Sequence, residues 1–286
     1  MFTVGWTTVS GKSVPPIGQG TWKMGASADA RQDELSALKK GFDLGLVLVD
    51  TAEMYADGGS ERLVGEAVSG QRDHVFITTK VWPQNASRAG TIAHLEASLK
   101  RLGTDYVDLY LLHWPSKTHP LEESMAGLTD ALERGLARYI GVSNFPADLL
   151  EEAERLTDHR IFANQVSYSL MAREPEVALI PYAKTHRVTL MAYSPLSGVV
   201  DPALDGSRQD ALCNVASRHD VSTTAVALAW VLRSESGPMV TIPKASRVEH
   251  VTHNAQALRV RLTDDDVELL DRAFPSAGRD IALERL

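Results

Sequence analysis

Short runs of apolar, often β-branched residues alternate along the whole chain with segments in which apolar residues recur at helical spacing. Most runs are apolar at consecutive rather than alternate positions, which is typical of parallel strands covered on both faces. The strands that these runs predict are 14–22, 46–51, 75–80, 106–113, 139–144, 162–168, 188–194 and 239–244. The pattern therefore predicts an α/β protein with a largely parallel sheet.

The segments between these strands also carry signals for helix ends. Ser27 and Ser60 are candidate amino-terminal caps, and Pro146 fits the first turn of a helix over 146–156. The glycines expected to end helices are Gly70, Gly103 and Gly135. We therefore expect most predicted strands to be followed by a helix.

This order of elements allows two architectures, a doubly wound sheet or a (β/α)8 barrel. A dinucleotide-binding doubly wound sheet should carry G-x-G-x-x-G after its first strand, and an acid ending a second strand about 20 residues later. The nearest match is GQGTWKMG at 18–25, whose third glycine is misplaced, and no acid follows at that distance. The sequence thus predicts a (β/α)8 TIM barrel.

Additions are expected at both ends of the barrel. The stretch WTTVSGKSV at 6–14, with Ser-Gly at its centre, predicts an amino-terminal β-hairpin. After residue 195 the pattern predicts two successive helices, at about 207–219 and 222–235, and a last helix from Thr263 to Phe274. No low-complexity tract, linker or charge block interrupts the chain, so we expect residues 1–286 to form one domain.

Composition narrows the classes of partner. The chain is 44% hydrophobic and 23% charged, with a net charge of −8 and a pI near 5.6, which disfavours nucleic acid or anionic membrane as the main partner. Its one cysteine, Cys213, excludes an intrachain disulfide. We find no signal-peptide pattern and no apolar run near the ~20 residues of a membrane span. A soluble, cytoplasmic protein is expected.

Polar residues end the predicted strands in a chemically complementary set. Asp50 ends the second strand, Tyr55 lies in the loop after it, Lys80 ends the third strand and His113 the fourth. Further polar residues close or occupy the later strands: Asn144, Gln165, Tyr193, Ser194 and Lys244. The carboxyl ends of barrel strands meet at one rim, so we expect these side chains to face a common pocket.

Taken one at a time, each residue has a structural explanation. Asp50 could cap a helix, Lys80 could be solvated, His113 could be a core histidine and Tyr55 a loop tyrosine in water. As a set they suit another role, because a lysine ammonium favours the phenolate and lowers a tyrosine pKa. An ionised aspartate keeps the lysine charged, and a neutral imidazole can donate a hydrogen bond to a substrate oxygen. The set can polarise and protonate a carbonyl, while hydride would have to come from a nicotinamide cofactor.

Seven motifs in order carry a resemblance: DTAEMY, ITTKVWP, LLHWP, GVSNF, NQVSYS, AYSPL and IPKAS. Along nearly its whole length the chain resembles the aldo-keto reductase family, and DTAEMYADGGSE and GQGTWKMG are most similar to bacterial members described as methylglyoxal reductases. The resemblance implies an oxidoreductase that uses NADPH to reduce small aldehydes, ketones and α-dicarbonyls such as methylglyoxal to alcohols.

The resemblance also implies a role for each matching position. Tyr55 would be the general acid, tuned by Lys80 and Asp50, and His113 would orient the carbonyl. Cofactor contacts are implied for Gly20, Thr21, Trp22, Asp50, Ser143, Asn144, Gln165, Tyr193, Ser194, Leu196, Lys244, Ser246, Arg247, His250 and Asn254. The implied substrate pocket consists of Trp22, Tyr55, Trp82, His113 and Trp114.

One position departs from the family pattern. His250 stands where many members carry an arginine against the adenosine phosphate, and a histidine cannot make the planar bidentate pairing of arginine. Lys244 and Arg247 still supply positive charge, so we expect NADPH to be preferred over NADH. The loops PSKTHPLEES and LSGVVDPALDG are short, which favours an open pocket for small carbonyl substrates.

Two other classes of function compete with this interpretation. Some barrels of this family are NADPH-binding regulatory subunits with slow turnover; the intact Asp, Tyr, Lys and His and the lack of an added segment argue against that role. A metal-dependent hydrolase would need a ligand set, and no carboxylate or cysteine completes a pair formed by His250 and His253. We expect a monomeric enzyme without a metal.

Overall fold

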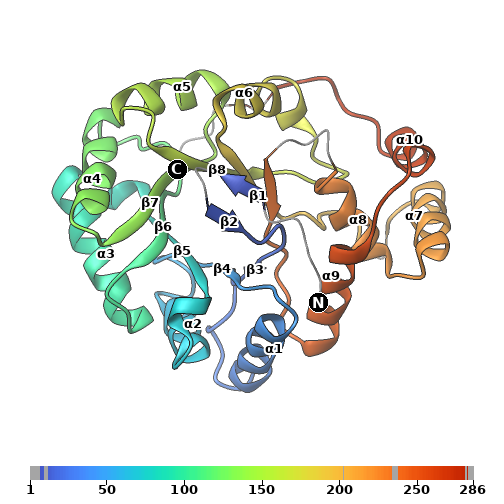
Figure 1. The fold of residues 1–286 in the computed structure, drawn as a ribbon, viewed down its shortest axis with the longest axis horizontal. Helices are drawn as coiled ribbons and strands as arrows, with labels where there is room; N and C mark the ends of the chain where they lie inside the picture. Colours follow the sequence, from blue (N-terminus) through green and yellow to red (C-terminus); the bar gives the residue numbers. More distant parts are fainter. Residues whose placement is uncertain (1–6, 10–11, 202, 234–237, 281, 283–286) are drawn as a thin grey trace.

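The computed structural model describes residues 7–9, 12–201, 203–233, 238–280 and 282. In this part of the chain, an eight-stranded parallel sheet curls into a barrel surrounded by helices (Figure 1). Its strands, hydrogen-bonded in chain order, are β3 (Gln19–Gly20), β4 (Leu48–Asp50), β5 (Phe76–Val81), β6 (Val107–Leu112), β7 (Ala137–Ser143), β8 (Ile161–Ser167), β9 (Thr189–Tyr193) and β10 (Met239–Thr241). Parallel bridges Ile17–Thr241 and Gly20–Lys244 join the first strand to the last. The predicted (β/α)8 barrel is confirmed.

The helices follow the strands in turn. They are α1 (Arg31–Asp43), α2 (Gly59–Val68), α3 (Arg88–Leu102), α4 (Leu121–Glu133), α5 (Ala147–Leu156), α6 (Leu179–His186), α7 (Gly206–His219), α8 (Thr223–Val231), α9 (Val248–Gln256) and α10 (Asp264–Ala273). The predicted additional helices α7 and α10 contact each other and lie outside the ring, at the right of Figure 1. None of the described helices is both long and apolar enough to cross a membrane.

Strand β6 shows why the strands are apolar at consecutive positions. Leu109 and Leu111 point into the barrel, where they pack with Phe162 and Met191. Tyr110 and Leu112 point outward into the larger apolar layer between strands and helices. Because both faces of the sheet are covered, every residue of β6 is buried.

Helix starts were predicted less well than strands or the carboxyl ends of helices. Gly103 does end α3 in the left-handed conformation (φ 66°). The caps predicted at Ser27 and Ser60 are wrong: α1 begins after Ala30, and α2 begins after Gly58, which has φ 74°. Ser60 lies inside α2, and its hydroxyl donates to backbone carbonyls of the loop after β3. A serine before an apolar periodic segment can therefore serve a tertiary contact instead of a cap.

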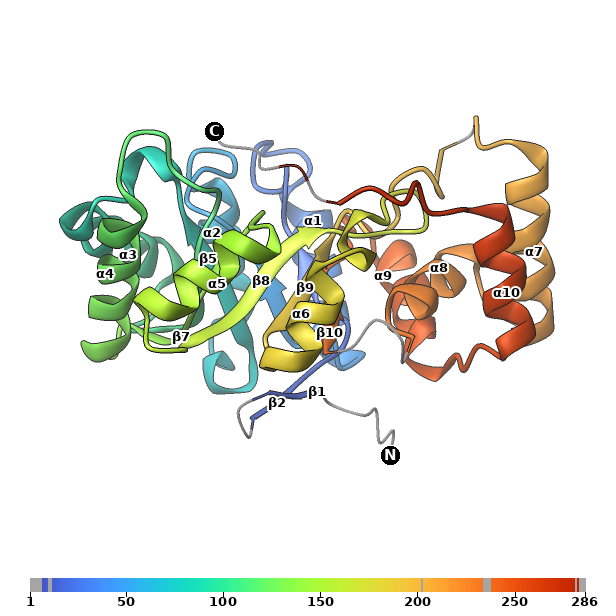
Figure 2. The same ribbon diagram turned by 90° about the horizontal axis from the view of Figure 1, so that it is seen from above.

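The predicted amino-terminal hairpin is present as β1 (Thr7–Val9) and β2 (Lys12–Val14), which pair antiparallel. Its expected Ser-Gly turn lies outside the described residues. The hairpin lies across the end of the barrel where the strands begin, whereas the segment after α10 runs along the end where they finish (Figure 2). The rim that carries the candidate site is thus opposite the hairpin.

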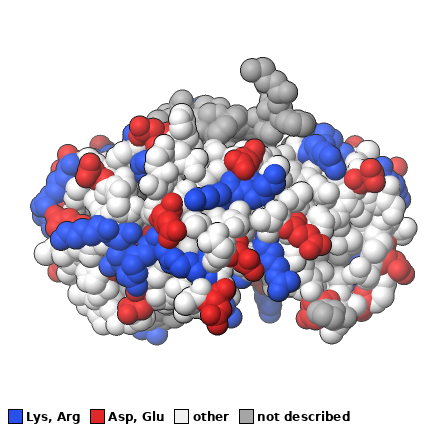
Figure 3. All heavy atoms as spheres, turned by 90° about the horizontal axis from the view of Figure 1, so that it is seen from below, with Lys and Arg blue, Asp and Glu red and all other residues white. Residues whose placement is uncertain are grey.

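Ion pairs link neighbouring outer helices. Arg31 of α1 pairs with Glu66 of α2, and Arg88 of α3 pairs with Asp130 of α4 at 2.7 Å. On the face shown in Figure 3, basic side chains are interspersed with acidic ones. The surface charge on that face is therefore mixed in sign.

Candidate active site

A cavity of about 360 Å³ lies at the carboxyl ends of the barrel strands. It is lined by Gly20, Trp22, Asp50, Met54, Tyr55, His113, Trp114, Ser143, Asn144, Gln165, Tyr193, Ser194, Ile242 and Lys244. Every lining residue except Met54 and Ile242 is among the predicted site residues. Ile242 stands two positions before Lys244 in extended chain, so period-two alternation could have identified it.

Lys80 forms a buried ion pair beneath this cavity. It projects from β5, and its Nζ donates to Asp50 Oδ2 at 2.7 Å and to the carbonyl oxygen of Thr51 at 2.8 Å. Gln165 Nε2 donates to the other carboxylate oxygen of Asp50 at 2.7 Å. Burial is the largest single influence and acts against the ammonium, but the charge of Asp50, the Tyr55 phenol and the hydrogen bonds to both together raise the pKa of Lys80. The lysine is therefore held charged and in place.

The phenol of Tyr55 lies between this ion pair and His113. Its oxygen is 3.4 Å from Lys80 Nζ and 3.5 Å from His113 Nε2, and its ring meets the imidazole edge-on. Burial raises the pKa of Tyr55 above 10.0, although the charge of Lys80 acts in the opposite direction. The expected lowering by the lysine is present but smaller than the effect of burial, so the group retains its proton at neutral pH.

His113 is buried and neutral. Burial, followed by the charge of Lys80, lowers the pKa of His113 well below 6.5. The ring stacks on Trp114 with centroids 4.4 Å apart, and Nδ1 has no hydrogen-bond partner among the described residues. Since Nε2 points to Tyr55, a neutral imidazole protonated there can donate to an oxygen placed beside the phenol.

A second wall of the cavity carries amide and hydroxyl groups. Tyr193 donates from its hydroxyl to Asn144 Oδ1 at 2.9 Å, and Asn144 Nδ2 donates to the carbonyl oxygen of His113 at 3.1 Å. Ser143 donates to the carbonyl oxygen of Gln165 at 2.8 Å. Asn144 adopts a left-handed conformation (φ 63°), which asparagine tolerates better than most residues. This wall could hold a planar ring that carries an amide.

Some predicted residues lie outside the cavity lining. They are Thr21, Lys80, Trp82, Leu196, Ser246, Arg247, His250 and Asn254. Thr21 is buried and donates to the carbonyl oxygen of Asp50 at 2.9 Å. Lys244 Nζ donates to Ser246 Oγ at 3.2 Å, and the chain then enters α9, which carries His250 and Asn254. The cofactor roles of these outer residues remain predictions.

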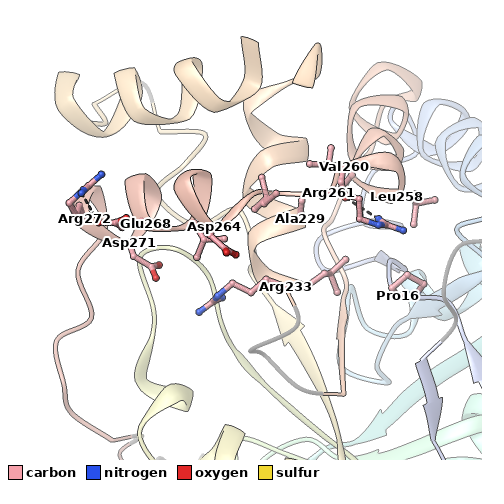
Figure 4. Close-up of a pocket in the computed structure, with 14 residues that line it drawn as sticks. Pro16, Ala229, Arg233, Leu258, Val260, Arg261, Asp264, Glu268, Asp271 and Arg272 are labelled. Carbon is pink, nitrogen blue, oxygen red and sulfur yellow. Dashed lines mark hydrogen bonds and ion pairs between the residues drawn. The ribbon is translucent and has the colours of Figure 1, made fainter. Parts of the chain in front are cut away.

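A larger hollow, of about 950 Å³, lies elsewhere on the molecule, beside α8 and α10 (Figure 4). Two of its arginines are engaged in ion pairs: Arg233 pairs with Glu176 at 2.9 Å, and Arg272 pairs with Glu268 at 2.8 Å. No tyrosine, lysine or histidine is among its described lining residues. Size alone therefore does not identify the reactive site. Within the described residues, no cluster of three or more His, Cys, Asp or Glu side chains could hold a metal ion.

Comparisons of the sequence and of the structure with known proteins identify relatives of one family. The sequence profile of the Aldo/keto reductase family matches residues 16–274. Methylglyoxal reductase YeaE of Escherichia coli (strain K12) is 43% identical over 95% of both chains, and methylglyoxal reductase DkgB of Salmonella typhi is 33% identical over 89% of this chain and 91% of its own. A crystal structure of an aldo-keto reductase from Klebsiella pneumoniae in complex with NADPH has a TM-score of 0.90 and 39% identity, and covers 100% of both chains.

Proposed function

Because this chain belongs to the aldo/keto reductase family and is an oxidoreductase, we propose that it uses NADPH to reduce small aldehydes, ketones and α-dicarbonyls to alcohols. Methylglyoxal is the substrate we expect first, since two relatives are methylglyoxal reductases. The observation that carries the proposal is the partly buried Tyr55 phenol, within reach of both Lys80 and His113 at the edge of the cavity.

The residues divide the chemistry between them. The Nε2 of neutral His113 and the hydroxyl of Tyr55 lie 3.5 Å apart at the cavity, so a carbonyl oxygen placed beside them would accept a hydrogen bond from each. When bound, NADPH supplies the hydride that no side chain can provide. As negative charge grows on the oxygen, Tyr55 donates its proton to it. Lys80 stabilises the phenolate left behind, and Asp50 keeps Lys80 charged.

The described residues fit a nicotinamide cofactor. Ser143, Asn144 and Gln165 offer hydroxyl and amide groups for a carboxamide, and the ring of Tyr193 borders the same wall. Lys244, at the rim, and Arg247, at the start of α9, would supply positive charge for a phosphate. Crystal structures of similar aldo-keto reductases contain NADP or NADPH.

The size of the cavity supports small substrates. Its 360 Å³ includes both the Tyr55 side and the wall assigned to nicotinamide, so the ring would fill part of it. The remaining space is bordered by Trp114 and by Trp22, whose surface is 57% exposed. A short carbonyl compound would therefore contact aromatic surface and the two hydrogen-bond donors.

Loss of NADPH absorbance with methylglyoxal tests the proposal, with wild type compared with Tyr55→Phe. Removing the proton donor should lower kcat by about 10²–10⁴-fold and leave NADPH binding, measured by tryptophan fluorescence, unchanged. A wild-type protein that binds NADPH tightly but reduces none of methylglyoxal, phenylglyoxal or aromatic aldehydes would contradict the proposal. It would then fit an NADPH-binding regulatory subunit.

A further inference from the structure

Glu53 lies in the loop between Asp50 and Tyr55, and its side chain is 7% exposed. Oε1 accepts the backbone N–H of Trp82 at 2.7 Å and the side-chain amide of Asn85 at 3.1 Å. Oε2 lies 2.6 Å from Nδ1 of His94 on α3. An ionised carboxylate can only accept, so this Nδ1 carries a hydrogen. Three donors from the connection after β5 and from α3 therefore converge on one side chain in the Tyr55 loop.

The segment Trp82 to Ala86, here called the bridge segment, is also held from its other side. Ser116 donates to the carbonyl oxygen of Pro83 at 2.9 Å, and Ser124 donates to that of Ala86 at 2.8 Å. Both serines follow β6 and Trp114 in the chain. The bridge segment is thus fixed between the loop that carries Tyr55 and the loop that carries Trp114, and Glu53 supplies the contacts on the Tyr55 side.

The Tyr55 loop needs such an anchor. Directly after Tyr55, the residues Ala56, Asp57 and Gly58 all have positive φ, at 50°, 51° and 74°, a conformation that costs free energy at the two non-glycine positions. The Tyr55 hydroxyl itself has only long contacts, at 3.4 and 3.5 Å. The position of the phenol is therefore determined by its loop more than by its own hydrogen bonds.

We infer that Glu53 is a positioning residue for the reduction: by binding the Trp82 N–H, Asn85 and His94, it holds Tyr55 at the correct distance from Lys80 and His113. Glu53 is absent from the described cavity lining, so it acts through the loop and not on the substrate. The inference rests on the proposed function, because it assigns Glu53 a role in the same reaction.

Three substitutions of Glu53 distinguish the effect of its side-chain length from the effect of its charge. Glu53→Gln keeps the length of the side chain and an oxygen for the Trp82 N–H, and a tautomer change at His94 lets its Nδ1 accept from the new amide. Glu53→Asp keeps the charge but withdraws it by one methylene, and Glu53→Ala removes both. A misplacement of about 1 Å can cost about 10²-fold in rate. We expect kcat to fall least in Glu53→Gln and about 10–100-fold in the other two, with the Kd for NADPH within about twofold of wild type.

Asp266 offers a matched control far from the site. It is a buried carboxylate on α10 that binds His219 at 2.8 Å and Arg218 at 2.7 Å. Asp266→Ala should lower the Tm but leave kcat unchanged, which separates lost stability from lost positioning. If Glu53→Asp is as active as Glu53→Gln, or if Asp266→Ala loses as much kcat as Glu53→Ala, the inference is overturned. The comparison of kcat between Glu53→Gln and Glu53→Asp tests the inference even if Glu53→Ala does not fold.

Amide hydrogen exchange gives a readout that needs no turnover. The Trp82 N–H should lose its protection from exchange in Glu53→Ala and Glu53→Asp and keep it in Glu53→Gln. The measurement is made on a proteolytic peptide that contains Trp82. Unchanged protection in all three variants would overturn the inference. Failure of the proposed function is distinguishable, because it would appear as absent turnover in wild type whatever the exchange at Trp82.

Discussion

The protonation of His113 connects one residue to the stability of the native state. The pKa of its imidazole lies well below 6.5 in the folded protein because the ring is buried beside Lys80, whereas the unfolded chain takes up a proton near 6.5. Below that pH the unfolded state binds more protons, so stability falls as pH decreases, by up to about 1.4 kcal/mol per pH unit. Above about pH 7.5 the contribution is constant.

Urea unfolding at pH 7.5 and pH 5.5 measures this effect. We expect wild type to lose about 1 kcal/mol or more beyond the loss seen in His113→Gln over this interval, since the variant lacks the titrating ring. Other groups titrate in both proteins and cancel in the difference. Equal losses in the two proteins would show that His113 is not held neutral by the fold.

The Asp50–Lys80 pair should affect stability and activity differently. Asp50→Asn leaves the Lys80 ammonium, which is 0% exposed, without its counter-charge, and breaking a buried pair in this way costs about 3–5 kcal/mol. Replacing both, as Asp50→Asn with Lys80→Met, removes the unpaired charge and should recover most of the stability. Turnover should stay low in both variants, because Lys80 loses the partner that keeps it charged and in place in the single variant and is absent from the double variant. Full recovery of kcat in the double variant would contradict the role of Lys80.

At the residue scale, the polar side chains of the site could be predicted from the sequence. The burial of these side chains and the residues that hold them in place could not. Strand ends showed where Asp50, Lys80 and His113 would meet, because the topology of a barrel fixes one rim. The net pKa direction of Tyr55 was not predictable, since it depends on how deeply packing buries the ring. Glu53 was missed because its partners come from a loop and a helix whose approach no local pattern encodes.

Between elements, backbones at the start of α2 and in the loop after β3 approach closely. A Cβ added at Gly59 would lie 2.5 Å from the carbonyl oxygen of Gly25. Gly59→Ala should therefore push the loop that carries Trp22 away from α2, lowering the Tm and raising the KM for methylglyoxal. Gly206→Ala is the matched control: Gly206 is also the first residue of its helix, and its Cβ would meet nothing within 4 Å. Equal Tm values for the two variants would contradict this contact.

Strands were predicted more accurately than helix starts for a physical reason. A strand covered on both faces needs consecutive apolar residues, and β6 has them at every buried position except Asp108, which binds the Ile77 N–H at 3.0 Å. A helix start can be satisfied in several ways. Thr263 forms a complete capping box with Asp266, whereas α2 starts after a left-handed glycine with no side-chain cap.

At the scale of the whole molecule, the sequence predicted the barrel and its additional elements. It did not predict how the first and last strands pair to close the barrel. The predicted first strand at 14–22 contributes only Gln19–Gly20 to the barrel sheet as a regular strand, and single bridges at Ile17 and Gly20 complete the ring. Pairing between the two ends of the sheet joins residues more than 200 positions apart, so local periodicity does not report it. The candidate cofactor wall extends from β7 to this closing seam at Lys244.

Because that wall spans several strands and continues to α9, cofactor binding should stabilise the entire barrel. A ligand at 100 times its Kd adds about 2.7 kcal/mol to the free energy of unfolding, which corresponds to a Tm increase of several degrees at this chain length. At equal concentrations NADPH should raise the Tm more than NADH, since Lys244 and Arg247 favour the additional phosphate. In the double variant Lys244→Ala with Arg247→Ala, the Tm increases caused by NADPH and NADH should become similar. In Arg259→Ala, a control outside the predicted site, NADPH should still raise the Tm more than NADH. A larger shift with NADH in wild type would mean that His250, in place of an arginine, has reversed the preference.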